Sequence, residues 1–160
     1  MVVIRCTQKL LRRISPTPPA SVKSTAKLGD WSANLLGVGH RRFVLVVSES
    51  TRLPLLLRAV DVRNIAANLP TALAPVLERL HVPRKAIAQE LSEMREACVC
   101  ATNNRSVLAS LNDFARQIKW HVYEEPDADL IDLSVRLSET PIIVPFGGES
   151  PLELTRRLLL

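Results

Sequence analysis

The densest set of polar side chains that could perform chemistry lies between residues 102 and 113, over an apolar pattern of helical spacing. It contains Asn104, Arg105, Ser106, Asn112 and Asp113. An arginine and a serine at the start of a helix could hold a phosphate or a carboxylate, because unpaired backbone N–H groups and the helix dipole favour an anion there. Asp113 could act as a general base if it lay within about 3 Å of the proton that it removes.

The same residues also have a purely structural interpretation. One of residues 102–104 would cap the helix, Arg105 would pair with an acid or a chain carbonyl, and Asn112 and Asp113 would bond a neighbouring loop. No Ser–His–Asp set, glycine-rich phosphate loop or HExxH pattern accompanies this segment in the sequence. The sequence therefore supports no specific catalytic mechanism.

A helix over residues 105–123 would position these side chains. Its apolar residues recur at spacings of three, four and seven, and they are Val107, Leu108, Leu111, Phe114, Ala115, Ile118 and Val122. Another face carries Ser106, Ser110, Asp113 and Gln117, three or four residues apart. We therefore expect one side of this helix to face the core and a polar side to stay outside it.

The rest of the chain alternates between strand-like and helix-like segments. Residues 2–6, 43–48, 53–60 and 97–101 predict strands, and residues 28–37 fit either a strand or one helical turn. Helices are expected at 8–14 with Thr7 as N-cap, at 61–80 where Pro70 and Pro75 should split or kink the helix, at 83–93 and at 128–138. The predicted fold class is α+β, with a small, mainly antiparallel sheet covered by four to six helices.

The last predicted helix has the clearest start signal. Ser150, Pro151 and Glu153 place a serine at the N-cap, a proline at N1 and a glutamate at N3, which is the pattern of a capping box. This pattern predicts a helix over residues 151–160.

The length of the chain indicates the number of domains, and its charge distribution indicates a basic region. The chain has 160 residues and 47% hydrophobic residues, which predicts a single domain over 1–160 with a mobile Pro- and Ser-rich loop at 15–27. Residues 1–42 hold eight Lys or Arg and one acid, Asp30, which gives them a net charge of +7. The rest of the chain carries −2, and the whole chain carries +5. A basic surface of this kind could meet phosphate or an acidic protein.

The three cysteines and the lack of long apolar runs predict the environment. An odd number of cysteines without an export signal indicates a reducing cytoplasm, and no membrane segment is expected. Cys98 and Cys100 alternate on a predicted strand and could ligate zinc with a histidine, but no second ligand pair stands at zinc-site spacing. We therefore expect small apolar fillers, no metal and no cofactor.

Three stretches resemble a family of small bacterial proteins of unknown function. They are Arg5-Cys6-Thr7-Gln8-Lys9-Leu10-Leu11, Leu28-Gly29-Asp30-Trp31, and the segment from Asn104 to Asp113. This sequence departs from the family pattern at Ala109 and Leu111, where glycine and methionine are usual. The resemblance implies a bacterial cytoplasmic origin and a shared fold, without a reaction.

The resemblance also narrows the candidate binding residues. They are Arg5, Thr7, Lys9, Trp31, Asn104, Arg105, Ser106, Asn112 and Asp113. The favoured function is a non-enzymatic binding or regulatory module for an anionic partner, either nucleic acid or protein. The alternative is an enzyme acting on a nucleotide or another phosphorylated substrate, with Arg105 holding the anion and Asp113 as base.

Overall fold

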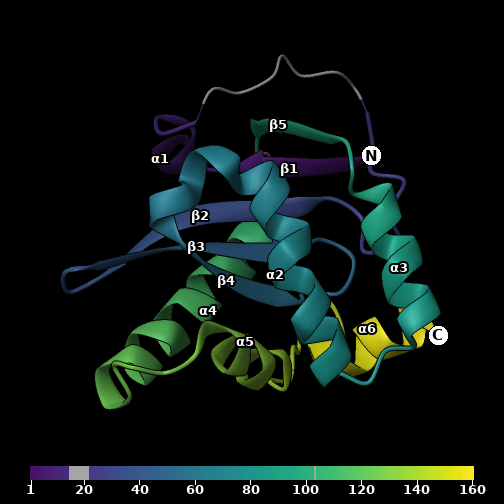
Figure 1. Ribbon diagram of the computed structural model, residues 1–160. Coiled ribbons are helices and arrows are strands. Elements are labelled where there is room, and N and C mark those ends of the chain that lie inside the picture. Colours follow the sequence, from purple (N-terminus) through teal and green to yellow (C-terminus); the bar gives the residue numbers. More distant parts are fainter. Residues whose placement is uncertain (15–21, 103) are drawn as a thin grey trace.

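A five-stranded mixed sheet is the centre of the protein (Figure 1). The computed structural model describes residues 1–14, 22–102 and 104–160. The strands are β1 (Val2–Cys6), β2 (Trp31–Val38), β3 (Arg41–Ser48), β4 (Pro54–Arg58) and β5 (Ala97–Ala101), in the order β4-β3-β2-β1-β5. β1 pairs in parallel with β2 and β5, whereas β3 is antiparallel to β2 and β4. The α+β class is confirmed, but the sheet is mixed rather than mainly antiparallel.

β2 is the central strand, and the sequence left this segment undecided between strand and helical turn. Ala33, Asn34 and Gly37 have little intrinsic preference for a strand. Tertiary pairing settles the conformation, because β2 bonds to β1 on one side and to β3 on the other. The predicted strand set therefore lacked the strand that joins the parallel and the antiparallel halves.

Six α-helices and one 3₁₀ helix occur in the part of the chain that the structure describes. They are α1 (Gln8–Leu11), η1 (Ala59–Asn64), α2 (Ile65–Arg79), α3 (Arg84–Glu93), α4 (Arg105–Glu124), α5 (Leu130–Ser138) and α6 (Pro151–Leu159). α6 begins with the predicted capping box, since the Ser150 side chain accepts from Glu153 N–H and the Glu153 carboxylate accepts from Ser150 N–H. The segment expected to extend β4 to residue 60 turns instead into η1.

α2 corrects the expectation that Pro70 and Pro75 would split it. Both prolines lie inside one helix of 15 residues. Each proline removes one backbone hydrogen bond, but the helix buries a stripe of apolar side chains in the core. This burial outweighs the lost bonds, because tertiary packing supplies most of a helix's stability in proteins.

The sheet separates two apolar layers. α1 and α2 lie on one face, over a core that includes Ile4, Trp31 and Val46 (Figure 1). α4 lies on the other face, where Phe114 and Ile118 pack with Leu45 and their neighbours. Because side chains alternate along a strand, odd-numbered residues of β2 face α2 and even-numbered residues face α4.

The connection between β1 and β2 is anchored where it is described. The Glu90 carboxylate of α3 is buried and accepts hydrogen bonds from Lys27 N–H at 2.9 Å and Leu28 N–H at 2.8 Å. Ser24 Oγ accepts from Val3 N–H at 2.8 Å. Residues 15–21 of the predicted mobile loop lie outside the described residues.

α1 is shorter than predicted and ends at Leu11. Thr7 stands at its N-cap position but makes no capping hydrogen bond with its side chain. Its hydroxyl donates instead to Asn34 Oδ1 of β2 at 2.6 Å. Thr7 therefore ties the end of β1 to the neighbouring strand.

Candidate functional site

A cluster of polar side chains lies on the α4-facing side of the sheet, near the point where β1 ends. We call Arg5, Asp30, Ser32, Glu49 and Asn104 the sheet-face cluster. They come from β1, the approach to β2, β2 itself, the end of β3 and the N-cap of α4. Pairing of β1 with both β2 and β5 brings these distant segments together.

Arg5 and Asp30 form the ion pair of the sheet-face cluster. Arg5 Nε donates to Asp30 Oδ2 at 2.8 Å, and Arg5 NH2 lies 2.7 Å from the same oxygen. Burial alone would raise the pKa of Asp30, but hydrogen bonds from Ser24 and Arg5 outweigh it, so the pKa lies below its usual value. At Arg5, burial alone would lower the pKa. The hydrogen bond and the charge of Asp30 outweigh burial, so the pKa of Arg5 lies above its usual value. Each group therefore keeps the other charged.

Glu49 and Asn104 join the cluster to the start of α4. Glu49 Oε1 accepts from Ser32 Oγ at 2.8 Å, and Glu49 Oε2 lies 3.5 Å from Asn104 Nδ2. Asn104 Oδ1 accepts from the backbone N–H groups of Ser106 at 3.1 Å and Val107 at 3.3 Å. The predicted role of an asparagine as helix cap is confirmed, and its amide also holds Glu49.

Cys6 and Cys100 lie near the cluster and are buried. Burial raises the pKa of Cys6 to about 12. Burial likewise raises the pKa of Cys100, although Arg5, whose NH1 lies 3.7 Å from Cys100 Sγ, acts in the opposite direction. All three cysteines are among the described residues and none forms a disulfide. Within the described residues, no group of three or more His, Cys, Asp or Glu side chains is placed to hold a metal ion.

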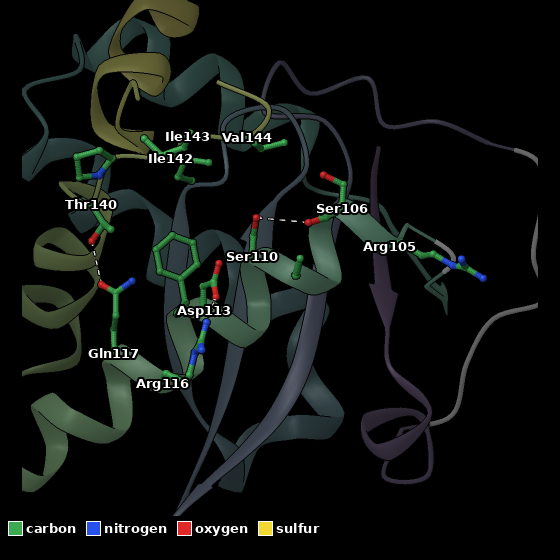
Figure 2. Close-up of a pocket in the computed structure, with 13 residues that line it drawn as sticks. Arg105, Ser106, Ser110, Asp113, Arg116, Gln117, Thr140, Ile142, Ile143 and Val144 are labelled. Carbon is green, nitrogen blue, oxygen red and sulfur yellow. Dashed lines mark hydrogen bonds and ion pairs between the residues drawn. The ribbon is translucent and has the colours of Figure 1, made fainter. Parts of the chain in front are cut away.

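An open groove runs along α4, beside the segment 140–144 that follows α5 (Figure 2). Its volume is about 920 Å³. The polar face predicted for this helix lines one side of it, with Ser106, Ser110, Asp113 and Gln117. Apolar side chains line the rest, from Phe114 on α4 to Ile142, Ile143 and Val144 opposite. We call this the α4 groove.

Internal contacts fix the lower part of the α4 groove. Thr140 Oγ1 donates to Gln117 Oε1 at 2.9 Å, which ties the two walls together (Figure 2). Asp113 forms an ion pair with Arg116 on its own helix. Asp113 is therefore neutralised locally, and the predicted bond between Asp113 and a neighbouring loop is not found among the described residues.

The upper end of the groove, which we call its head, has groups that are free to bind. Arg105 is exposed and makes no hydrogen bond or ion pair with any described residue. Its side chain extends away from the groove toward solvent (Figure 2). Ser106 is exposed too, and its Oγ accepts from Arg52 NH2 at 3.1 Å.

Arg52 lies behind the head of the α4 groove, in contact with its lining residue Ser106. Its guanidinium contacts Ser106 on α4 and stacks 5.5 Å from the ring centroid of Phe146, which follows segment 140–144. The residue is only 4% exposed, and its Nε has no hydrogen-bond partner among the described residues. Burial lowers the pKa of Arg52, and the charge of Glu49 offsets this only in part.

The remaining candidates lie apart from the groove. Trp31 is fully buried in the core under α2. Lys9 is exposed on α1, Thr7 bonds to Asn34, and Asn112 is exposed on the outer side of α4, away from the groove lining. Of the nine candidates, the structure brings Arg105, Ser106 and Asp113 to the groove, and Arg5 and Asn104 to the sheet-face cluster.

Sequence reasoning missed Arg52 and the apolar wall at 142–144. Arg52 lies in the short connection between the predicted strands 43–48 and 53–60, where an arginine is normally exposed. A positive φ of 60° at Arg52 turns its side chain inward, and Arg52 N–H bonds to Ser48 O at 2.9 Å. No local pattern signals this, because the contacts with residues 106 and 146 span more than 50 positions.

These features define an α+β protein with a partly apolar groove whose head carries excess positive charge. The chain belongs to the family described as Domain of unknown function (DUF6933), whose model matches residues 3–153. The resemblance seen in the sequence motifs is thereby confirmed at the level of a family of unknown function. Comparisons with curated proteins and with solved structures found no match.

Proposed function

We propose that this protein is a non-enzymatic binding module whose α4 groove takes an extended segment of a partner protein, one that carries both apolar and acidic side chains. The observation that carries the proposal is the groove itself. It offers an apolar wall, a row of hydroxyl and amide groups, and unpaired cationic side chains at its head. Ligand-binding sites in proteins typically combine apolar walls with a few precisely placed polar groups.

Exposed apolar side chains support a protein partner. Ile143 is 72% exposed and Val144 is 79% exposed, and both lie on the groove wall. Trp120 and Tyr123 are also exposed on the C-terminal half of α4. Exposed apolar side chains on a groove wall, with exposed aromatic residues elsewhere on the same helix, are characteristic of protein interaction surfaces.

The distribution of basic residues favours protein over nucleic acid. Arg5 is paired with Asp30, Lys9 lies on α1, and Arg41 at the β2–β3 hairpin donates to Pro126 O. The basic first third is thus spread over separate elements instead of forming one track for a phosphate backbone. Charge complementarity at the groove therefore points to a few acidic groups on a partner.

The groove geometry gives less support to the enzyme alternative. Asp113 is exposed and ion-paired with Arg116 on its own helix. A general base is normally tuned by burial or neighbouring charge toward the working pH. None of the described residues that line the groove is a histidine or a cysteine.

The cellular setting is part of the same proposal. We expect the module to work in a reducing compartment such as a bacterial cytoplasm, supported by three cysteines without a disulfide. No helix among the described residues is long and apolar enough to cross a membrane.

Selection from a random peptide library tests the proposal. Enriched peptides should combine apolar residues with Asp, Glu or a free C-terminus, and their affinity should fall at least about tenfold for Ile143→Asp, because the change places a charge on the apolar wall. Val60→Asp is the matched control, since Val60 is 84% exposed on η1 and remote from the groove lining. If no peptide family is enriched, or if both variants bind equally, the groove is not a peptide site.

A further inference from the structure

The head of the α4 groove is where a buried positive charge meets an exposed hydroxyl. Arg52 is nine-tenths or more buried, forms no ion pair with any acid among the described residues, and leaves its Nε without a partner. Burying an arginine without a paired acid is costly. Such a group persists where the surrounding structure fixes it, and here it faces the first turn of α4.

The surrounding loop is built to hold Arg52 in place. Arg52 has a φ of 60°, in the left-handed region that residues other than glycine rarely adopt. Ser48 Oγ accepts from Thr51 N–H at 3.2 Å, and Thr155 Oγ1 of α6 donates to Thr51 Oγ1 at 3.0 Å. Arg52 NH1 also donates to the backbone oxygen of Glu49. Strained residues that the structure holds this firmly cluster at functional sites.

Ser106 connects the buried guanidinium of Arg52 to the groove by a hydrogen bond. Its Oγ accepts a hydrogen bond from Arg52 NH2, and no acceptor among the described residues takes its own hydroxyl hydrogen. A hydroxyl that accepts from a cation becomes a stronger donor. The O–H of Ser106 is therefore available for an incoming anion, with the guanidinium fixed behind it.

Arg105 completes the arrangement from the solvent side. It is exposed and has no hydrogen-bond or ion-pair partner among the described residues, so rotation of its side chain toward Ser106 breaks no such bond. The backbone N–H groups of Ser106 and Val107 are already bonded to Asn104. The backbone of the helix N-terminus therefore has few free N–H groups for an anion. Arg52 and Arg105 supply positive charge, and Ser106 and Arg105 supply the hydrogen-bond donors.

We infer that the head of the α4 groove is a subsite for a single carboxylate, held by Ser106 and Arg105 and stabilised by the buried charge of Arg52. This rests on the proposed function for its occupant, a segment of a partner protein. A carboxylate matches the charge at the head: Glu49 offsets part of the charge of Arg52, and Arg105 adds one positive charge that no described acid pairs. Its source is either the partner's C-terminus or an Asp or Glu side chain.

Titration with sodium acetate, followed by amide NMR, tests the subsite without any peptide. We expect saturable shifts at Ser106 and Val107 with a dissociation constant of about 10 mM, and no such shifts in sodium chloride of equal ionic strength. Affinity should fall at least about fivefold in Ser106→Ala and in Arg105→Ala. Arg116→Ala is the matched control, because Arg116 lines the groove but is engaged by Asp113.

Arg52 is tested by two variants, because replacing a buried, hydrogen-bonded arginine with methionine can destabilise the fold. Arg52→Met should abolish saturable acetate shifts, whereas Arg52→Lys should keep part of the affinity if the charge is what matters. If Arg52→Met does not fold, Ser106→Ala decides. Unsaturable shifts, equal shifts in chloride, unchanged affinity in Ser106→Ala and Arg105→Ala, or phosphate binding more than about tenfold tighter than acetate would overturn the carboxylate assignment.

Peptides selected on the groove distinguish the source of the carboxylate and separate the two proposals. Loss of binding on C-terminal amidation assigns the terminal carboxylate, and loss on Asp→Asn or Glu→Gln assigns a side chain. If acetate binds but no peptide is ever selected, the peptide-binding proposal fails alone. If peptides bind through Ile143 but ignore Ser106, Arg105 and Arg52, the subsite fails alone.

Discussion

The sheet-face cluster and the α4 groove both adjoin the N-terminus of α4, but their polar groups differ in whether they have partners within the chain. In the cluster, Arg5, Asp30 and Glu49 each have a partner within the chain. At the head of the groove, Arg105 has none among the described residues, and Ser106 keeps a hydroxyl hydrogen to donate. Internally satisfied groups stabilise the fold, whereas unsatisfied exposed groups remain available for a partner.

The comparison predicts its largest effect at Asp30. Asp30→Ala should lower the free energy of unfolding by about 2–3 kcal/mol, because it leaves Arg5 without its carboxylate and Ser24 N–H without its acceptor. The corresponding fall in Tm is about 5–10 °C in a chain of this size. Differential scanning calorimetry measures it, with Glu96→Ala as an exposed control. A variant that melts within a degree of the wild type would show that the ion pair is not structural.

The same ion pair predicts a pH dependence of stability. The pKa of Asp30 is lowered in the folded protein, so its contribution is fully present above the ordinary Asp pKa of about 3.9 and is lost as the pH falls through the folded-state value. The stability difference between wild type and Asp30→Asn should therefore be constant from about pH 7 to pH 5 and shrink at about pH 3 and below. Urea midpoints measured across this range check it. A difference that grows on acidification contradicts the assigned direction.

The third prediction concerns the place where the two regions meet. Glu49 accepts from Ser32 and Asn104 in the cluster, and its charge also acts on Arg52 at the groove. Glu49→Gln should cost about 1 kcal/mol of stability through its weaker hydrogen bonds. It should also tighten acetate binding about threefold, because it removes one partly screened negative charge.

Thermal melts and acetate titrations of the same Glu49→Gln sample measure both effects. Ser32→Ala is the comparison, since it removes the hydrogen bond from Ser32 Oγ to the Glu49 carboxylate and leaves the negative charge in place. If Glu49→Gln weakens acetate binding, Glu49 orders the groove head rather than opposing the anion, and the two regions form one site.

Sequence patterns predicted the local features of this molecule well. The apolar stripe of α4, its polar face with Ser106, Ser110, Asp113 and Gln117, and the capping box of α6 all follow from contacts three or four residues apart. Such short-range rules are visible in one sequence. The α+β class follows from them too, because alternating periods of two and 3.6 residues determine which elements form.

Long-range pairing explains what the sequence could not predict. β2 becomes the central strand only because β1 and β3 bond to it. Arg52 comes to lie behind the groove head, in contact with the lining residue Ser106, only because a turn at one end of the sheet lies against α4 and Phe146. The candidate residues chosen from sequence motifs therefore divided between the cluster, the groove and other parts of the fold, with Trp31 in the buried core.

The smallest expected effect is on the stability of three variants of exposed α4 residues, Arg105→Ala, Asn112→Ala and Asp113→Ala. Each should melt within about 2 °C of the wild type, because exposed side chains contribute within about 0.5 kcal/mol and an i,i+3 ion pair such as Asp113 with Arg116 contributes about as little. Only Arg105→Ala should also weaken acetate binding, since Asn112 lies outside the groove and Asp113 is engaged by Arg116. A fall of several degrees in two of the three would place the groove among the structural regions, alongside the sheet-face cluster, and would remove the contrast from which its binding role is inferred. Unchanged melting together with a loss of binding confined to Arg105→Ala would separate the two regions by their function as well as by their hydrogen bonds.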